Sequence, residues 1–204
     1  MTSKYQLKDN SFYIQNTDVP KNRFNIKDSV VIHQLEKELL QEAYKIFIDE
    51  LNSDTLFNEN YLIELHKRTF ESLYEWAGVY RDFNMTKGDS RFCQGAFIQT
   101  SSEKIFEELK SENYLKDYIN KPKDEFAKKL AYYKCELIAL HPFCELNGRV
   151  LRMFFDMIAI FNGYNFINYS TISPQKYIEA SIECVQLANC IKLEKIILNG
   201  LKKG

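Results

Sequence analysis

One short stretch of the chain gathers side chains that can manage a proton and a chain of phosphates. It carries an imidazole, a carboxylate, a carboxamide and two guanidinium groups, on His141, Glu145, Asn147, Arg149 and Arg152. An imidazole, with an ordinary pKa of about 6.5, is the usual general base at neutral pH. A carboxylate is a ligand for Mg²⁺, and guanidinium groups bind phosphate oxygens. The stretch therefore predicts a site where His141 deprotonates a hydroxyl beside a metal-bound polyphosphate.

The residues that follow Glu145 predict a turn that leads into a helix. Asn147 and Gly148 allow close approach of the backbone, and the N-terminus of a helix near Arg149 favours an anion. Structural alternatives remain open: Glu145 could balance the helix dipole, and the two arginines could pair with acidic residues on other helices. Two cations at a helix N-terminus oppose the dipole, which favours a bound phosphate between Arg149 and Arg152.

The rest of the pattern predicts one mainly α-helical domain with a small β-hairpin that positions this stretch. Helical periodicity or capping residues occur at 28–47, 60–74, 102–115, 123–140, 149–161 and from Pro174 to about Gly200. The helix 149–161 is apolar on all sides, so we expect it to be central and buried. Turn residues at 87–90 predict the hairpin, within about 84–98. Residues 1–28 are expected to form an irregular N-terminal arm, and residues 29–204 the domain itself.

Composition limits the partners and the compartment. The chain has 204 residues with 27 Lys and Arg against 28 Asp and Glu, so global charge predicts neither a nucleic-acid nor a membrane surface. No signal peptide or long apolar run is apparent, which favours the cytoplasm, although export to a host cell stays open. The five cysteines are odd in number and lack a Cys-x-x-Cys pair, so we expect reduced thiols.

Read as His-x-Phe-x-Glu-x-Asn-Gly-Arg-x-x-Arg, the stretch from His141 to Arg152 resembles the signature of the Fic (filamentation induced by cAMP) family. The resemblance implies a protein adenylyltransferase that transfers AMP from ATP to a Ser, Thr or Tyr hydroxyl and releases pyrophosphate. It implies that His141 is the base, that Glu145 holds Mg²⁺, and that Arg152 supports the phosphates. The turn implied to cradle the phosphates comprises Glu145, Leu146, Asn147, Gly148 and Arg149.

A second segment is similar to the one that precedes the signature in that family. It comprises His66, the run from Tyr74 to Arg81, Thr86-Lys87-Gly88 and Phe92. The resemblance implies that the hairpin is a flap over the site and that it binds a target protein as an added strand. Lys87 and Gly88 would then lie near the nucleotide.

The chain departs from the family pattern at Leu146, where Gly or Ala is usual. The branched side chain either narrows the phosphate turn or points inward, so a catalytically weak binding module or the use of another nucleotide are alternatives. Gly148 argues against the Doc-like branch, which has Lys there and phosphorylates its target. A metal hydrolase that uses His141, Cys144 and Glu145 is a third reading, weakened by the small number of histidines.

The resemblance also bears on control of the activity. Many relatives carry an inhibitory helix of the form Ser/Thr-x-x-x-Glu-Gly/Asn, and the run from Thr55 to Asn60 fits that string. It directly precedes the helix predicted at 60–74, so we interpret it as a helix start. We therefore expect inhibition by a separate antitoxin protein, as in a toxin–antitoxin pair, or no inhibition.

Overall fold

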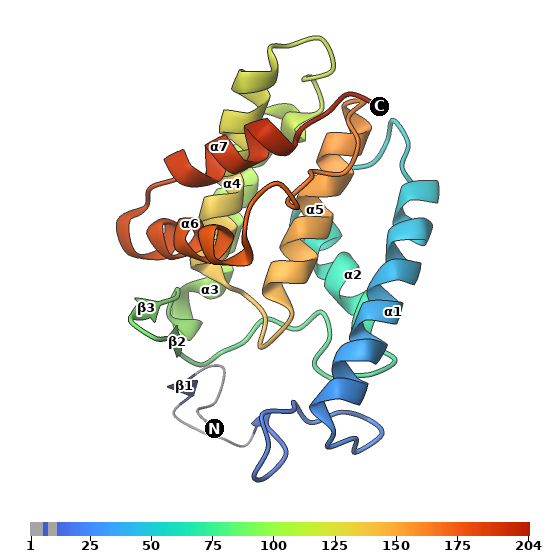
Figure 1. The fold of residues 1–204 in the computed structure, drawn as a ribbon, viewed down its shortest axis with the longest axis vertical. Coiled ribbons are helices and arrows are strands. Elements are labelled where there is room, and N and C mark those ends of the chain that lie inside the picture. Colours follow the sequence, from blue (N-terminus) through green and yellow to red (C-terminus); the bar gives the residue numbers. More distant parts are fainter. Residues whose placement is uncertain (1–5, 8–11) are drawn as a thin grey trace.

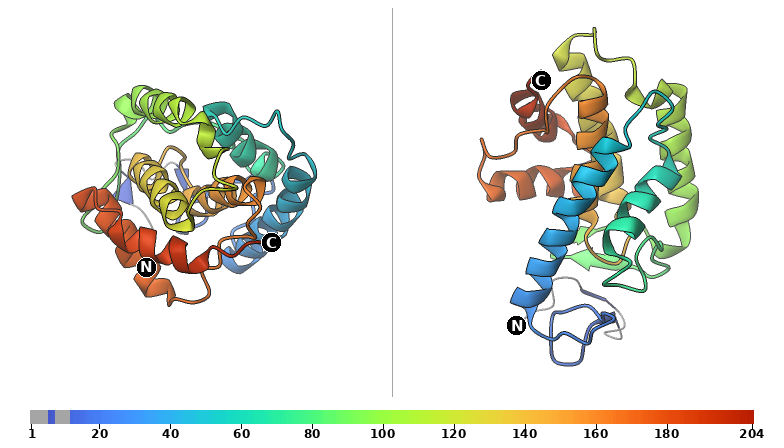
Figure 2. Two further views of the ribbon diagram at one scale, coloured as in Figure 1. Left: turned by 90° about the horizontal axis from the view of Figure 1, so that it is seen from above. Right: turned by 90° about the vertical axis from the view of Figure 1, so that its right-hand side faces the viewer.

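The computed structural model describes residues 6–7 and 12–204, and in it two helices form the centre of a helical bundle. These are α4 (Lys123–Leu140) and α5 (Asn147–Phe161), which the motif stretch connects. Seen from above, the remaining helices surround this pair (Figure 2). The prediction of a mainly α-helical fold with a small hairpin is confirmed (Figure 1).

The outer helices begin where the sequence supplies capping side chains. Asp28 accepts the N–H groups of Val30 and Val31 at the start of α1, and Ser173 accepts that of Lys176 at the start of α6. The outer helices are α1 (Ser29–Asp49), α2 (Glu59–Phe70), α3 (Ile98–Ser111), α6 (Pro174–Leu187) and α7 (Ile191–Gly200), with short 3₁₀ turns at Gly95–Phe97 and Asn113–Leu115. Asn58 caps α2, so the run from Thr55 to Asn60 is a helix start, as predicted. No helix in the part of the chain that the structure describes is long and apolar enough to cross a membrane.

Several helix boundaries differ from the prediction. Helix α5 begins at Asn147 instead of Arg149, α3 begins at Ile98 instead of Ser102, and α2 ends at Phe70 instead of Tyr74. Periodicity marks the apolar face of a helix but not its last turn, which is set by local backbone bonds. The shift of α5 matters, because it puts Asn147 and Gly148 inside its first turn.

The predicted hairpin is present and is part of a three-stranded antiparallel sheet in the order β1-β2-β3. Strands β2 (Met85–Lys87) and β3 (Ser90–Arg91) pair Lys87 with Ser90 across a two-residue turn. Gly88 opens that turn with φ +56°, a conformation that such hairpin turns require and that glycine adopts readily. The third strand, β1 (Gln6–Leu7), was not expected and pairs with the other edge of β2.

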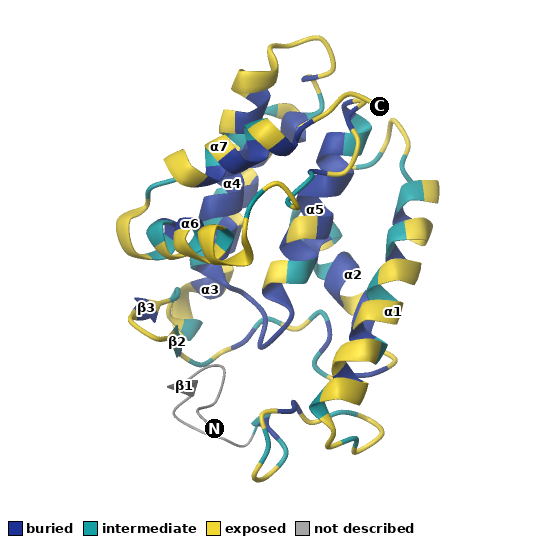
Figure 3. Ribbon diagram, in the orientation of Figure 1, coloured by how far each residue is buried: buried dark blue, intermediate teal, exposed yellow. Residues whose placement is uncertain are grey.

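Helix α5 is as buried as its composition predicts. Ten of its residues are buried, and they include the run from Met153 to Ala159. Figure 3 shows α5 and the facing side of α4 as the darkest part of the ribbon. This apolar centre fixes the ends of both helices, and therefore the position of the loop between them.

The N-terminal arm, predicted at 1–28, is described here only in part, since residues 1–5 and 8–11 lie outside the described residues. From residue 12 to 28 it is irregular and is held by backbone hydrogen bonds. Ile14 N–H donates to the carbonyl of Val19, and Arg23 N–H donates to that of Leu73. The boundary at residue 28 stays a prediction.

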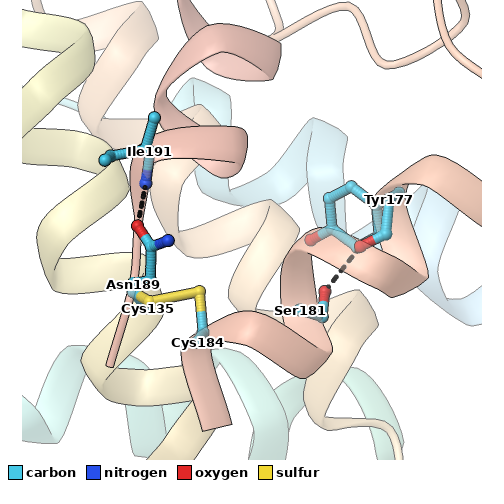
Figure 4. Close-up of a disulfide and its surroundings, with 6 residues drawn as sticks. All are labelled: Cys135, Tyr177, Ser181, Cys184, Asn189 and Ile191. Carbon is cyan, nitrogen blue, oxygen red and sulfur yellow. Dashed lines mark hydrogen bonds between the residues drawn. A yellow bond between two sulfur atoms is a disulfide. The ribbon is translucent and has the colours of Figure 1, made fainter. Parts of the chain in front are cut away.

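The expectation of five reduced thiols is wrong for two of them. Cys135 on α4 and Cys184 on α6 form a disulfide, with Cα atoms 5.0 Å apart (Figure 4). The two residues are 49 positions apart in the sequence, and pairing at that range cannot be read from spacing alone. The remaining cysteines, Cys93, Cys144 and Cys190, are free thiols.

Candidate active site

A cavity of about 270 Å³ opens where the hairpin, the end of α4, the start of α5 and one face of α6 meet. It brings together five of the predicted site residues: Lys87, His141, Asn147, Gly148 and Arg152. Four others do not line it: Gly88, which adjoins Lys87 in the turn, and Glu145, Leu146 and Arg149. The cavity is therefore the part of the predicted site that can accept a ligand.

His141 ends α4 in a left-handed backbone conformation, with φ +48° and ψ +60°. Its N–H still donates to the carbonyl of Leu137, so the residue closes the helix and turns the chain toward α5. Its ring stacks on that of Phe92 beside β3, with ring centroids 3.9 Å apart. The imidazole is thus oriented by an aromatic contact at the cavity wall, with 8% of the residue exposed.

Arg81 binds the turn at His141 through hydrogen bonds, a role that the sequence alone did not indicate. Its guanidinium is buried and donates to the carbonyls of His141, at 2.8 Å, and Cys93, at 2.7 Å, and its backbone N–H donates to Pro142. Burial lowers the pKa of Arg81 from its ordinary value. One side chain therefore links the segment after the hairpin to the backbone of the residue predicted to be the base.

The side chain of Asn147 closes the motif loop on itself. Its Oδ1 accepts the N–H of Phe143 at 2.9 Å, and its Nδ2 donates to the carbonyl of Phe143 at 2.7 Å. Both polar atoms of the amide are thus engaged within the loop, so the side chain shapes the turn. A ligand contact from Asn147 is better supplied by its backbone N–H, since the first N–H groups of a helix lack partners within the helix.

Gly148 is exposed, and the space above it is open. A Cβ atom built on Gly148 would meet no atom within 4 Å. The first turn of α5 thus presents bare backbone to the cavity, next to Arg152, whose guanidinium carbon lies 5.5 Å from the centre of the Tyr177 ring. Helix N-termini with exposed N–H groups bind anions, and Arg152 adds a positive charge.

Leu146 adopts the left-handed conformation that is rare for a branched residue, with φ +68° and ψ +5°. Its side chain is 6% exposed and belongs to the hydrophobic core. Of the two orientations that the sequence left open, the structure has the inward one. The conformation costs about 1–2 kcal/mol for a residue with a Cβ, and core packing offsets it.

Glu145 is buried at the head of α5 and is held by residues far away in the sequence. The hydroxyl of Tyr13 donates to its Oε1 at 3.2 Å, and the N–H of Leu146 donates to its Oε2 at 3.3 Å. Its backbone carbonyl lies 3.2 Å from Nε2 of His66. The N-terminal arm and α2 therefore both reach the motif loop at Glu145.

His66 supports the loop as a neutral imidazole. The N–H of Gly78 donates to its Nδ1 at 2.9 Å, which assigns the ring proton to Nε2, where it faces the carbonyl of Glu145. The ring stacks on Phe143 with centroids 3.9 Å apart. Complete burial lowers the pKa of His66 to about 4. His66, which belongs to the segment that is similar to the one before the family signature, therefore has a structural role.

Arg149 and Arg152 are separated by the structure. Arg152 lines the cavity, whereas Nη1 of Arg149 donates to Oε2 of Glu36 on α1 at 2.6 Å. The hydroxyl of Tyr74 donates to the other oxygen of Glu36 at 2.7 Å. For Arg149, the alternative of pairing with an acidic residue on another helix is therefore the observed state.

Helix α6 supplies a wall of the cavity that sequence reasoning missed. Its lining residues are Tyr177, Ile178, Ser181, Ile182 and Val185. Ile178 and Ile182 are 46% and 38% exposed. Their helical spacing, i and i+4, was the available signal.

The described residues do not form a metal site built from protein ligands alone. Within residues 6–7 and 12–204 no group of three or more His, Cys, Asp and Glu could hold a metal ion. Mg²⁺ can take a single carboxylate and draw its other ligands from phosphates and water. In this structure Glu145 does not line the cavity, and its two carboxylate oxygens accept hydrogen bonds from Tyr13 and Leu146. Burial raises the pKa of Cys144 to about 12, so this thiol is a poor metal ligand, against the hydrolase reading.

Comparison with known proteins gives one consistent result. A sequence model of the Fic/DOC family matches residues 56–159. The chain is 27% identical to the probable protein adenylyltransferase Fic of Escherichia coli K12, over 89% of this chain and 87% of that protein. It is 32% identical to the protein adenylyltransferase VbhT of Bartonella schoenbuchensis, over 88% of this chain and 37% of that protein.

A solved structure shares the fold over nearly the whole length. The N-terminal Fic domain of a VirB-translocated Bep effector protein from Bartonella quintana, with bound ADP, superposes with a TM-score of 0.79 at 26% identity. The match covers 94% of each chain. The architecture around the cavity is therefore that of known Fic domains.

Proposed function

The chain belongs to the Fic/DOC family, and from this membership we propose that it is a protein adenylyltransferase that transfers AMP from ATP to a Ser, Thr or Tyr hydroxyl of a target protein. The observation that carries the proposal is the cavity in which His141 lies with Lys87, Gly148 and Arg152. The relatives named as protein adenylyltransferases, and the ADP in the Bartonella quintana domain, support it.

The proposed reaction assigns one proton and one bond to this geometry. The target hydroxyl oxygen attacks the α-phosphorus of ATP while His141 takes the hydroxyl proton. The bond from the α-phosphorus to the oxygen that bridges it to the β-phosphate breaks, and pyrophosphate leaves. Such catalysis rests mainly on positioning and on stabilising charge. The Phe92 ring and the Arg81 guanidinium fix the imidazole and the backbone of His141 in advance.

The phosphate chain is proposed to lie at the first turn of α5. The exposed backbone of Gly148 and the side chains of Arg152 and Lys87 surround that space. Mg²⁺ would supply further neutralisation of phosphate charge, and Glu145 would hold it if its carboxylate turned from Tyr13 toward the cavity. The adenine would lie against the apolar wall of α6. Arg149 would act from behind the loop, through Glu36, unless the ion pair opens.

The inward position of Leu146 bears on the alternative of a catalytically weak module or a different nucleotide. That alternative arose because the side chain could narrow the turn. The position of Leu146 in the core and the open space above Gly148 support transfer of AMP over that alternative. The hairpin, about 84–98, is proposed to hold the target segment, and a separate antitoxin protein is proposed as the inhibitor.

The test is transfer of label from ATP. The full chain is incubated with Mg²⁺, ATP labelled at the α-phosphate and a bacterial lysate, beside His141→Ala and the control His33→Ala on the exposed face of α1. We expect labelled protein with the wild type and with His33→Ala, and none with His141→Ala. Calorimetry should show that His141→Ala still binds ATP. No label with wild-type chain, or equal label with His141→Ala, would refute the proposal. Mass spectrometry of the product identifies the added group and the modified residue.

A further inference from the structure

The β-hairpin has two edges, and the described part of the chain covers both. On the β3 side, helix α6 packs against the hairpin, and Nε2 of Gln186 lies 3.4 Å from Oγ of Ser90. On the β2 side, Gln6 pairs with Thr86 and Leu7 pairs with Met85 in antiparallel register. Figure 1 shows β1 beside β2, on the side of the sheet away from β3. The edge of β2 is therefore the hairpin edge that a strand can occupy, and a strand of this chain occupies it.

The segment that follows β1 is tied to the body near the motif loop. The Phe12 ring lies 5.1 Å from that of Trp76, and the buried Tyr13 donates to Glu145. Two backbone hydrogen bonds, from Lys21 to Phe12 and from Arg23 to Leu73, secure the loop beyond it. A strand attached so close to its docking edge pairs at a high effective concentration, in the millimolar range for short tethers.

A strand of two residues makes few hydrogen bonds, so its pairing is weak in itself. Such a strand keeps the edge covered, and so protected from unspecific pairing with other chains. A longer extended segment, which binds with more backbone hydrogen bonds and with side-chain pockets, can displace it from the edge. A strand with these two properties acts as a competitor that a partner segment displaces.

We propose that the strand Gln6–Leu7 is an intramolecular competitor, which occupies the outer edge of β2 in place of the target segment that the hairpin is proposed to hold. This inference deepens the proposed adenylyltransferase function, because the partner would be the protein that is modified. The chain then sets its own threshold for targets: a segment must outcompete β1 before its hydroxyl can reach His141.

The test uses the full chain and separates backbone pairing from side-chain effects. The variant Gln6→Pro/Leu7→Pro removes both N–H donors of β1, and the control Gln6→Ala/Leu7→Ala keeps them. Hydrogen–deuterium exchange is followed at residues 85–87. We expect exchange in the proline variant to be faster by roughly 2- to 10-fold, the factor for losing one backbone hydrogen bond, and the alanine variant to behave like the wild type.

A synthetic peptide with the sequence of residues 1–12 serves as the probe of the vacated edge. We expect it to bind the proline variant and to restore slow exchange at residues 85–87, and to bind the wild type much more weakly. A peptide with the same two prolines is the control. Unchanged exchange in the proline variant, or equal binding of the native peptide to both chains, would overturn the proposal.

The activity arm is kept apart from the binding arm. If the chain transfers AMP, the proline variant should label lysate proteins faster than the alanine variant at low lysate concentration, and the difference should shrink at high concentration. If no variant labels any protein, the proposed reaction fails while exchange and peptide binding still decide the role of β1.

Discussion

The carboxylate of Glu36 on α1 and the guanidinium of Arg149 on α5 form an ion pair with an N–O distance of 2.6 Å, which joins the first helix of the domain to the motif. Glu36 is 4% exposed, and the Tyr74 hydroxyl satisfies its second oxygen. Arg149 retains a partly exposed side chain, so the pair lies at the boundary between the core and solvent. The contact turns the first motif arginine away from the cavity and fixes the start of α5.

Replacement of Glu36 by Gln should weaken this attachment. The variant keeps a hydrogen-bonding oxygen for Tyr74 but loses the charge that balances Arg149. We expect the free energy of unfolding, measured by urea denaturation, to fall by about 1.5–3 kcal/mol, the range for a hydrogen bond to a charged group. Glu42→Gln, which removes an exposed pair with Lys45, is the control and should change it by less than about 1 kcal/mol. Equal stability of the two variants would contradict the role of Glu36.

Gly148→Ala should separate folding from ligand binding. Its backbone needs no positive φ, and the new methyl group would meet no protein atom, so stability should be unchanged or higher by about 0.5–1 kcal/mol. Because the methyl group would enter the cavity, ATP binding measured by calorimetry should weaken by about 1–3 kcal/mol, as for overpacking. ATP binding equal to that of the wild type would show that the phosphates lie elsewhere.

At position 146 a glycine variant should be more stable than an alanine variant, which is the reverse of the usual order in a helix. Leu146→Ala loses core packing and keeps the left-handed strain, whereas Leu146→Gly loses the packing and relieves the strain. We expect both to unfold more easily than the wild type, with the glycine variant more stable than the alanine variant by about 1 kcal/mol. In an ordinary helical position the alanine variant would be the more stable one, so that order would disprove the strain argument.

His66 should make stability depend on pH. Its pKa is lowered to about 4 in the folded chain, against about 6.5 when unfolded. Between these values the unfolded chain binds the proton and the folded chain does not. Neutral His66 therefore makes its full contribution to the free energy of unfolding above pH 6.5. As the pH falls toward 4 the free energy of unfolding decreases, by about 3 kcal/mol in total. His66→Phe, which cannot titrate, should be less stable at neutral pH and should lack this share of the slope in urea denaturation from pH 4 to 7. An identical slope in both chains would contradict a buried neutral His66.

The Cys135–Cys184 disulfide should be visible as a thiol count. The denatured chain should expose three thiols without reductant and five after reduction, measured by alkylation and mass spectrometry. Cys184→Ser should lower the free energy of unfolding without reductant by up to about 4 kcal/mol, the chain-entropy value for a loop of this length, and should match the reduced wild type. Cys190→Ser is the control. Five thiols before reduction would show that the pair is not oxidised in solution.

Much of the fold followed from sequence because local and global signals agree. Asp28 caps the first helix, Pro174 opens α6, and the apolar run after Arg152 requires a buried position. The hairpin followed from its turn residues. These features depend on neighbouring residues only, which is why pattern and spacing suffice.

The parts that could not be predicted all depend on contacts between distant segments. Glu36 meets Arg149 across 113 positions, Tyr13 meets Glu145 across 132, and Arg81 meets His141 across 60. The sequence places His141, Gly148 and Arg152 in one motif, and the structure gathers them around one cavity. The sequence could not indicate that Arg149 and Leu146 face away from the cavity, because packing in the core sets the direction in which each side chain points. The α6 wall lies beyond residues 56–159, which the family model matches.

Trp76 is the only tryptophan of the chain, and its ring contacts both Phe12 of the N-terminal arm and Tyr74 of the segment after α2. Its indole emission therefore reports on one place, the junction between the arm and the body. Departure of Phe12 would expose the indole to water and shift the emission to longer wavelength. The chain thus contains an intrinsic fluorophore with which docking and release of its own arm can be followed in stopped-flow experiments, without an attached dye.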